Sequence, residues 1–528
     1  TVPQMIIKTS GIAANFLCDN SSYFLGIDNK GKPERSKECF QYAKEKHNQI
    51  LKETDSMASK AVRRYFEKWD PAVAMENPVL AENLEEILAG ANLIFYFAGS
   101  YLQEDSAIKA AWEKYRQETS DGPKGICLVT GQKTKISRIH GTIKGVAGAQ
   151  TSGAAFVSFN APAFESYGKE QSFNAPVGNY AVYAYTTALN HLLGDRKHVT
   201  TIGDTTVVYW SEDGEEVCQD VFADVSAPSS ANYEVVDGVF KNLEAKKAVN
   251  VPGVDKAIST EQRFYILGLS PNAARLAVRF FYQDSFGNIL NHIKAHYDRM
   301  EIAKSAKDEM QYMGIWRMLM ETVNKKSKEK KPLSNMAGAV YRAVVSGERY
   351  PNSMYQAVMG RIRAEQDDSD NRTYKITRGR AAIIKAFLLR NTNYGKEDIT
   401  VALNEKSENV VYTLGREFAV LEEIQEAANP GLNATIKDRY FNSACATPAS
   451  VFPILFKLKN SHIKKMRDKK KEIYYEKILT DLQGRIPLAD TGVLAYPKRL
   501  SLEEQGMFIL GYYHQTQKRY EKKAKEEV

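Results

Sequence analysis

The sequence predicts an α+β N-terminal region followed by an all-α, helical-bundle C-terminal region, in a multidomain chain. Its 528 residues are enough for roughly two to four domains that each bury a core. Up to about Leu269, short β-like runs alternate with helical runs. After about Asn288 the β signal disappears and apolar residues recur at helical spacing. We therefore expect domains at residues 1–287, 288–400 and 401–528.

The first region mixes both kinds of element. The expected strands are Tyr23 to Ile27, Ile94 to Phe97, Phe156 to Phe159 and Thr205 to Trp210. The expected helices are Lys37 to Leu51, Ser56 to Lys68 and Ala107 to Gln117. This mixture predicts the α+β domain.

The second region has helical periodicity interrupted by two polar stretches. The expected flexible joints are Lys325 to Lys331 (KKSKEKK) and Ala364 to Thr373 (AEQDDSDNRT). Ser501 and Glu504 have the spacing of a capping box at the start of the last helix. Long helices are expected after Val401, at Val411 to Ala428, Pro448 to Lys470, Lys471 to Gln483 and Ser501 to Lys525.

The composition argues against several classes of protein. Hydrophobic residues make up 43% and charged residues 26%, as in ordinary globular proteins. No apolar run reaches the roughly 18 residues that span a bilayer, so no membrane role is expected. The five cysteines are scattered without a C-x-x-C pair, so we expect neither disulfides nor a thiolate zinc site, and a reducing, cytoplasmic location. The chain opens at Thr1 rather than methionine, as a fragment of a longer chain would.

The charge favours an acidic polymer as partner. The net charge is +8 and the pI is near 8.8, although many large proteins with such a charge bind no nucleic acid. Basic residues gather on one or two expected helices, where a phosphate-binding row and a merely solvated helix face are both open interpretations. These residues are Lys457, Lys459, Lys464, Lys465, Arg467, Lys469, Lys470, Lys471 and Lys477.

The segment from Gly145 to Val177 has the composition of a surface that contacts a polymer. It is rich in glycine, which lets backbone N–H groups approach a ligand, and in amides that can bind base edges. Aromatic side chains add faces for stacking, and two lysines add positive charge. The alternative is a Gly-rich hairpin whose polar side chains satisfy its own turns. The side chains concerned are Gln150, Asn160, Gln171, Asn174, Phe156, Phe159, Tyr167, Phe173, Lys144 and Lys169.

No constellation in the sequence favours an enzyme. His292 and His296 have the i, i+4 spacing of zinc ligands, but a third ligand is missing, so a partly buried structural pair is favoured. The acids from Asp367 to Asp370 are better interpreted as a solvated linker. The chain also lacks a G-x-x-x-x-G-K-[ST] loop, so we expect neither a catalytic centre nor a cofactor or metal.

Long ordered blocks carry a family resemblance over nearly the whole chain. They are GIAANFLCDNSSYFLGID (Gly11 to Asp28), RSKECFQYAKEKH (Arg35 to His47), SGAAFVSFNAPAFESYGKEQSFNAPV (Ser152 to Val177), IGDTTVVYW (Ile202 to Trp210), LGLSPNAARLAVRFFYQDSFG (Leu267 to Gly287), AAIIKAFLLRN (Ala381 to Asn391), NATIKDRYFNSACATPASVFP (Asn433 to Pro453) and LSLEEQGMFILGYYHQ (Leu500 to Gln515). With these blocks the chain resembles the large subunit of the subtype I-C CRISPR Cascade effector, an RNA-guided DNA surveillance complex. Members of that family usually carry several dozen more residues before the equivalent of Gly11.

The resemblance implies a non-catalytic subunit beside the repeat-processing subunit, the backbone subunits and the small subunits, at the end of the complex that carries the 5′ handle of the guide RNA. Such a subunit would recognise the protospacer-adjacent motif in double-stranded DNA and assist strand separation. It would also hold the displaced non-target strand and support recruitment of the helicase-nuclease. Pairing with the guide RNA would supply the remaining sequence specificity.

The resemblance does not say which side chain meets which base, so the site residues are hypotheses. For motif reading and strand wedging we choose Lys144, Gln150, Thr151, Ser152, Asn160, Lys169, Gln171 and Asn174, and in the N-terminal block Asn15, Asp19, Asn20 and Ser21. For the backbone of the non-target strand we choose Arg275, Arg279, Lys464, Lys465 and Arg467.

The segment from about residue 400 resembles the small subunit of Cascade, which family members also make from an internal translation start. We expect this segment to fold alone as a bundle that lines the R-loop groove. Two alternatives for the whole chain stay open: a scaffold that holds neighbouring subunits without touching DNA, and a metal-dependent nuclease that uses His292 and His296.

Overall fold

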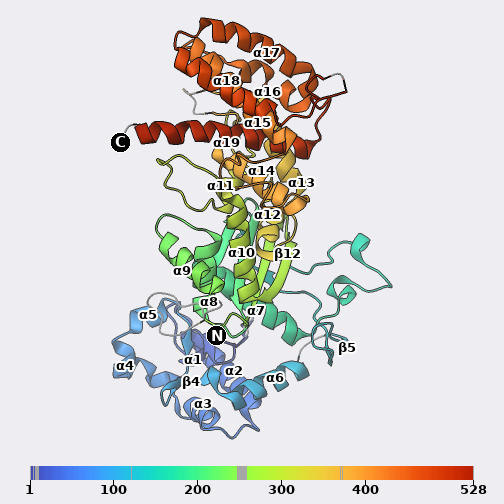
Figure 1. Cartoon of the computed structure of the whole chain (residues 1–528). Coiled ribbons are helices and arrows are strands. Elements are labelled where there is room, and N and C mark those ends of the chain that lie inside the picture. Colours follow the sequence, from blue (N-terminus) through green and yellow to red (C-terminus); the bar gives the residue numbers. More distant parts are fainter. Residues whose placement is uncertain are drawn as a thin grey trace. The chain divides into compact units, whose positions relative to one another are not determined.

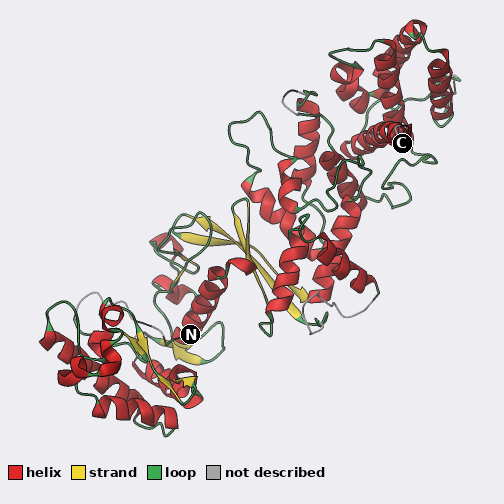
Figure 2. Ribbon diagram, turned by 90° about the vertical axis from the view of Figure 1, so that its left-hand side faces the viewer, coloured by secondary structure: helices red, strands yellow, loops and turns green. Residues whose placement is uncertain are grey.

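The computed structural model describes residues 2–3, 5, 11–119, 122–245, 258–368, 370, 373–490 and 492–526. The chain folds into two compact units (Figure 1): unit 1 is Thr1–Ile143 with Ala155–Leu189, and unit 2 is Lys144–Ala154 with Asn190–Val528. The strands lie before residue 286, and every named element of the described chain after β12 (Arg275–Ser285) is a helix (Figure 2). The predicted fold class, an α+β region followed by helices, is confirmed.

The N-terminal part of unit 1 packs helices around an aromatic core. The helices are α1 (Ser21–Phe24), α2 (Pro33–Leu51), α3 (Met57–Lys68) and α6 (Ser106–Thr119), and short strands β1 (Cys18–Asp19) and β2 (Leu93–Ile94) pair beside them. Pro33 suits the first turn of α2, and Ser56 caps α3 by accepting a hydrogen bond from the Ser59 N–H. His47 lies fully buried among aromatic rings, and burial lowers its pKa to about 4, so it packs as a neutral ring.

Two expected strands of unit 1 are wrong. Residues Ser21–Phe24 form α1, because the Asn20 side chain accepts a hydrogen bond from the Ser22 N–H and caps a helical turn. Phe156 to Phe159 lies in bends, and only the preceding pair Ala154–Ala155 (β8) is a strand. The bends at Phe156 and Val157 end the strand pairing directly after β8, and the 3-10 turn Pro162–Phe164 begins six residues after Phe156.

Unit 2 is built on an antiparallel sheet. Within this unit the strand order is β8-β12-β11-β10-β9, with β9 (Val199–Ile202), β10 (Thr205–Ser211) and β11 (Arg263–Asn272). One face of the sheet packs against α8 (Glu216–Ser226), α10 (Phe286–Met300) and α12 (Ser334–Ser346). Rings interlock there: Phe264 lies 5.0 Å from both Phe222 and Phe286, measured between ring centroids.

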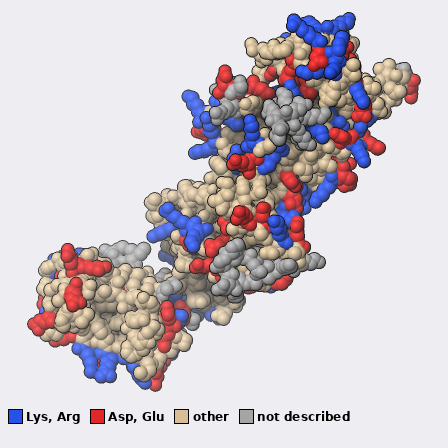
Figure 3. Space-filling view, turned by 60° about the vertical axis from the view of Figure 1, so that its left-hand side comes forward, with Lys and Arg blue, Asp and Glu red and all other residues tan. Residues whose placement is uncertain are grey.

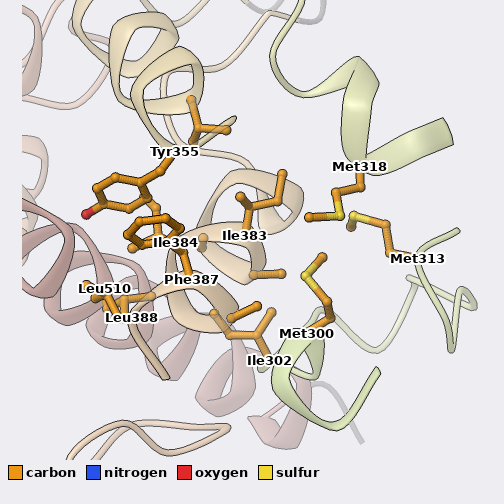
Figure 4. Close-up of a cluster of buried hydrophobic side chains, with 14 of the residues drawn as sticks. Met300, Ile302, Met313, Met318, Tyr355, Ile383, Ile384, Phe387, Leu388 and Leu510 are labelled. Atoms are coloured by element: carbon orange, nitrogen blue, oxygen red, sulfur yellow. The ribbon is translucent and has the colours of Figure 1, made fainter. Parts of the chain in front are cut away.

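The centre of the helical part is α14 (Arg378–Asn391), which is buried on nearly every side. Ile383, Ile384, Phe387 and Leu388 of α14 lie among methionines and aliphatic side chains from the surrounding helices and connecting segments (Figure 4). Because α14 is buried on nearly every side, it lies in the middle of the core, and its two buried cations, Arg380 and Lys385, need partners from the chain.

The C-terminal helices are held by one unusually close contact. In α15 (Val410–Ala428), a Cβ at Gly415 would lie 2.0 Å from the Phe508 carbonyl oxygen of α19 (Leu502–Glu526). A Cβ at Gly511 would lie 2.0 Å from the Tyr412 carbonyl oxygen, so only glycine at both positions lets the two backbones touch. The bundle is completed by α16 (Ile436–Ala446), α17 (Pro448–Lys465) and α18 (Lys469–Gln483).

The predicted capping box is present, whereas the flexibility of the two polar joints stays a prediction. The Ser501 N–H donates to Glu504 Oε2 at 2.6 Å and the Glu504 N–H donates to Ser501 Oγ at 3.2 Å, which confirms the box. Lys325 to Lys331 lies in turns between α11 (Ile315–Met320) and α12. In Ala364 to Thr373, residues 369, 371 and 372 lie outside the described residues.

The domain boundaries at residues 287 and 400 stay predictions. One hydrophobic cluster extends from Ile202 to Tyr513, so the sheet of unit 2 and the helices after it share a core. The chain's described helices include none that is long and apolar enough to cross a bilayer.

Candidate nucleic-acid interface

An exposed cationic surface lies on α17 and α18. The two helices meet at Met466, which is buried, and Asp468, whose side chain caps α18 by accepting from the N–H groups of Lys470 and Lys471. Basic side chains therefore lie on both sides of this capped turn. Lys and Arg side chains gather at the top of the view in Figure 3. We call the following exposed residues the α17–α18 basic surface: Lys457, Lys464, Lys465, Arg467, Lys470, Lys471 and Lys477.

Few acids neutralise these charges. Lys459 pairs with Glu476 at 2.7 Å and Lys469 with Glu472 at 2.6 Å. No residue of the α17–α18 basic surface forms an ion pair with any other residue that the structure describes. Burial, and after it the charge of Lys465, lowers the pKa of His462 beside them. A surface of uncompensated positive charge is the electrostatic signature of a polyanion site.

Five residues were predicted to hold the non-target strand, and they lie on two different layers of unit 2. Lys464, Lys465 and Arg467 belong to the α17–α18 turn, whereas Arg275 and Arg279 belong to β12 of the sheet (Figure 1). Arg279 donates to Asp204 Oδ2 at 2.7 Å, so its charge is partly neutralised. The α17–α18 turn is therefore the better-supported part of this prediction, which stays a prediction.

The Gly-rich loop of unit 2 presents its polar side chains outward. Two side chains of unit 2 hold its backbone: the Lys144 N–H donates to Asn190 Oδ1 at 2.7 Å, and the Ala147 N–H donates to Thr206 Oγ1 at 2.9 Å. Gly145 has φ +87°, and a Cβ there would lie 3.2 Å from Leu193. The loop thus displays its four predicted site residues from a stiff turn; Lys144, Gln150, Thr151 and Ser152 are all exposed.

The predicted residues of the following segment belong to unit 1 and behave differently. The Asn174 side chain accepts from the Ser166 N–H at 2.8 Å and donates to the Lys169 and Gln171 carbonyls at 2.7 and 2.9 Å. Gln171 Oε1 accepts from Arg138 Nε at 2.8 Å. The Asn174 amide satisfies local turns, as the alternative interpretation expected, whereas Gln171 contacts a distant side chain. Asn160 and Lys169 are exposed.

The predicted N-terminal residues are engaged inside unit 1. Asp19 is 1% exposed, and its carboxylate accepts from the N–H groups of Asn15 and Asn20 at 2.7 and 2.9 Å. Asn15 and Ser21 are also buried, and Asn20 caps α1. Their geometry positions the start of α1, and a role in motif reading stays a prediction.

Sequence reasoning missed an aromatic row on the open face of the unit 2 sheet. The ring of Tyr265 lies 5.4 Å from Trp210 at an interplanar angle of 11°, and 6.3 Å from Phe281 at 26°. Phe281 is 54% exposed. The signal was present in LAVRFFYQ, because consecutive aromatics in a strand point to opposite faces, so Phe280 and Phe281 cannot both enter one core.

A second surface that sequence reasoning missed lies in unit 1, on the hairpin of β5 (Lys124–Ile126) and β6 (Lys133–Lys135). Lys124 lies opposite Lys135 in the register, and like charges directly opposed destabilise a strand pair. The apolar side chains of Ile126, Leu128 and Val129 are each at least 66% exposed here. Exposed apolar and like-charged side chains together indicate a surface shaped for a partner.

The histidine pair of the nuclease alternative is engaged by the fold. His292 Nδ1 lies 3.1 Å from the Val345 carbonyl oxygen, and His296 Nδ1 lies 2.7 Å from Tyr350 Oη. Burial lowers the pKa of His296 to about 3. Among the residues whose placement is described, no group of three or more His, Cys, Asp or Glu is arranged to hold a metal ion.

These features define a class: a multidomain α+β and helical protein with an exposed basic helix pair and an exposed polar loop. The family model described as CRISPR-associated protein (Cas_Csd1) matches residues 1–520, and the chain belongs to this family. Membership indicates a CRISPR-associated subunit of a Cascade-type complex. No curated protein matches the chain.

Proposed function

We propose that the chain is the non-catalytic large subunit of a subtype I-C Cascade. In this proposal it recognises the protospacer-adjacent motif in double-stranded DNA, assists strand separation, holds the displaced strand and supports recruitment of the helicase-nuclease. The observation that carries the proposal is the α17–α18 basic surface, whose charges have no acidic partner within the described chain of a CRISPR-associated subunit.

The basic surface suits a single strand better than a base-specific contact. Lysine is a point charge on a flexible stem, and six of the seven residues of this surface are lysines, so they would follow a phosphate backbone without reading sequence. Tyr474, which is 43% exposed, lies beside them on α18 and offers a ring face to an unstacked base, and the exposed Ile473 offers apolar contact.

The Gly-rich loop of unit 2 suits motif reading. Amide and hydroxyl groups on a rigid support discriminate base edges better than mobile ones, because their donors and acceptors cannot reorient to suit a different base. Gln150 is the residue we place at a base edge, with Lys144 on a neighbouring phosphate.

The test measures binding of the reconstituted guide complex, with and without this chain, to target duplexes with randomised flanking trinucleotides at fixed salt. The proposal expects the chain to select a narrow set of flanks. Gln150→Ala should broaden that set, whereas the control Gln356→Ala, an exposed glutamine on α13 (Asn352–Ala364), should not. Equal gain in affinity for every flank would favour the scaffold or clamp alternative instead.

A second arm tests the non-catalytic role. Purified chain incubated with duplex and single-stranded DNA in magnesium or manganese should leave the DNA intact. Cleavage that depends on the divalent ion and disappears in His292→Ala would contradict the proposal.

A further inference from the structure

Three arginines converge on the short connection between α12 and α13. Gly347 ends α12 with φ +67°, and a Cβ there would lie 2.7 Å from the His292 ring, so the chain turns sharply before Arg349. Arg390 Nε donates to the Glu348 carbonyl at 3.3 Å, and Arg299 Nε donates to Tyr350 Oη at 3.4 Å.

The arginine cluster, defined as Arg299, Arg349 and Arg390, lacks acidic partners. None of the three forms an ion pair with a described residue, and the nearby Glu348 pairs with Arg342 at 2.8 Å instead. Burial, and then the charges of Arg299 and Arg349, lower the pKa of the Arg390 guanidinium. Three like charges held together in this way repel one another, and an anion would relieve the repulsion.

Arg349 of the cluster lines a cavity that has further donors. The cavity has a volume of about 380 Å³ and is lined by Arg349, Tyr350, Asn352, Phe387, Asn391, Thr392 and Glu503. Asn352 begins α13, a helix of 13 residues whose N-terminus has no side-chain cap. Backbone N–H groups at an uncapped helix N-terminus attract anions, and here they adjoin the arginines.

The connection is held rigidly in place. The Tyr350 N–H donates to Asn391 Oδ1 at 3.0 Å, and Asn391 Nδ2 donates back to the Tyr350 carbonyl at 2.8 Å. The guanidinium carbon of Arg299 lies 5.7 Å from the centroid of the Tyr350 ring. The cluster is therefore organised before any ligand arrives, which lowers the entropy lost on binding.

We propose that Arg299, Arg349 and Arg390, with the N-terminus of α13, bind a phosphate group of a nucleic-acid backbone. Guanidinium groups offer paired N–H donors that match phosphate oxygens, and the helix N-terminus supplies donors that favour the same ligand. This site is separate from the α17–α18 basic surface, which lies on other helices, and it does not depend on motif reading.

Inorganic phosphate is the first probe. The thermal midpoint of the full chain is measured against phosphate at constant ionic strength, with chloride as reference. Phosphate should raise the midpoint, and Arg349→Gln should weaken phosphate binding about tenfold, as expected for one charge-assisted contact. Arg349 is exposed, so this variant should fold normally. The matched control Arg317→Gln removes an exposed charge from α11 and should leave phosphate binding unchanged.

Glu503→Gln tests whether the cavity binds an anion rather than a cation. Glu503 lines the cavity and opposes an anion, so its neutralisation should strengthen phosphate binding. If phosphate raises the midpoint of Arg349→Gln as much as that of the unmodified chain, or if Glu503→Gln weakens binding, the proposal is overturned.

Two further ligands identify the source of the phosphate. A labelled oligothymidine should bind with a salt slope that falls by about one unit in Arg349→Gln, and free phosphate should compete with it. Binding of an acidic peptide that is lost in Arg349→Gln, while oligothymidine binding is unchanged, would overturn the nucleic-acid assignment. These outcomes do not depend on the flank-selection experiment, so the two proposals can fail separately.

Discussion

The buried cations around α14 and the exposed cations of the α17–α18 basic surface show two different uses of positive charge in unit 2. Arg380 is fully buried, and its guanidinium lies 2.7 Å from Glu365 and donates to two backbone carbonyls. Lys385 donates to the Arg299 carbonyl at 3.0 Å, and burial lowers its pKa to about 8. The exposed cations have no such partners. The comparison teaches that a buried cation is stabilised by acceptors of the chain itself, whereas the exposed cations of this surface are free to bind an external anion.

The largest expected effect comes from breaking a buried pair. Arg380→Met should lower the free energy of unfolding by about 3 kcal/mol, because Glu365 would stay buried and lose its nearer cation, keeping only Arg361 at 3.9 Å. Chemical denaturation measures the loss. The double variant Arg380→Met with Glu365→Gln should recover part of it, and a double variant no more stable than the single one would contradict the pair's role.

The C-terminal bundle should lose stability when it is separated from α14. Expressed alone, residues 401–528 should be helical by circular dichroism, because Gly415 and Gly511 keep α15 and α19 in contact. Its thermal midpoint should nevertheless fall below that of the full chain, since the Tyr355–Leu502 and Tyr513–Ala303 hydrogen bonds are lost, at roughly 1 kcal/mol each. An unfolded fragment would contradict the expectation that this segment folds alone.

One buried acid, unlike the buried cations, has no partner for its charged form among the described residues. Glu417 of α15 is fully buried, neither carboxylate oxygen has a hydrogen-bond partner among the described residues, and burial raises its pKa to about 8. The folded state therefore binds a proton that the unfolded state releases near pH 4.5, so this residue lowers stability as pH rises from about 4.5 to 8. Glu417→Gln should flatten that part of the stability profile and add about 1–2 kcal/mol at pH 8. Parallel pH profiles for the two proteins would contradict it.

The smallest effect on stability should come from the basic surface itself. Replacing Lys464, Lys465 and Arg467 together by glutamine should change the free energy of unfolding by less than about 0.5 kcal/mol. The salt slope of single-strand binding should fall by about three units. The matched control replaces three exposed lysines between α11 and α12, Lys325, Lys328 and Lys330, and should keep the slope. An equal fall in both triple variants would show that only net charge matters.

Several helices could be predicted from periodicity within a residue or two. Ser56 to Lys68 corresponds to α3 with its Ser56 cap, and Val411 to Ala428 corresponds to α15. The boundary between α17 and α18 was predicted at Lys470, but α17 ends at Lys465 and α18 begins at Lys469. The capping role of Asp468 was not recognised within the continuous run of basic residues. Helical periodicity is local, so it indicates where a helix lies but shows a break only where a capping residue is recognised.

The sequence by itself determined the fold class, the basic stretch of α17 and α18, and the family to which the chain belongs, because these depend on residue types and their order. Only the tertiary structure decided which polar and charged side chains have partners inside the chain. Asn174 and Gln150 look alike in sequence, yet Asn174 is held by its own turns and Gln150 is exposed. Arg380 and Arg349 differ in the same way, because burial and counter-ions come from segments far apart in the chain.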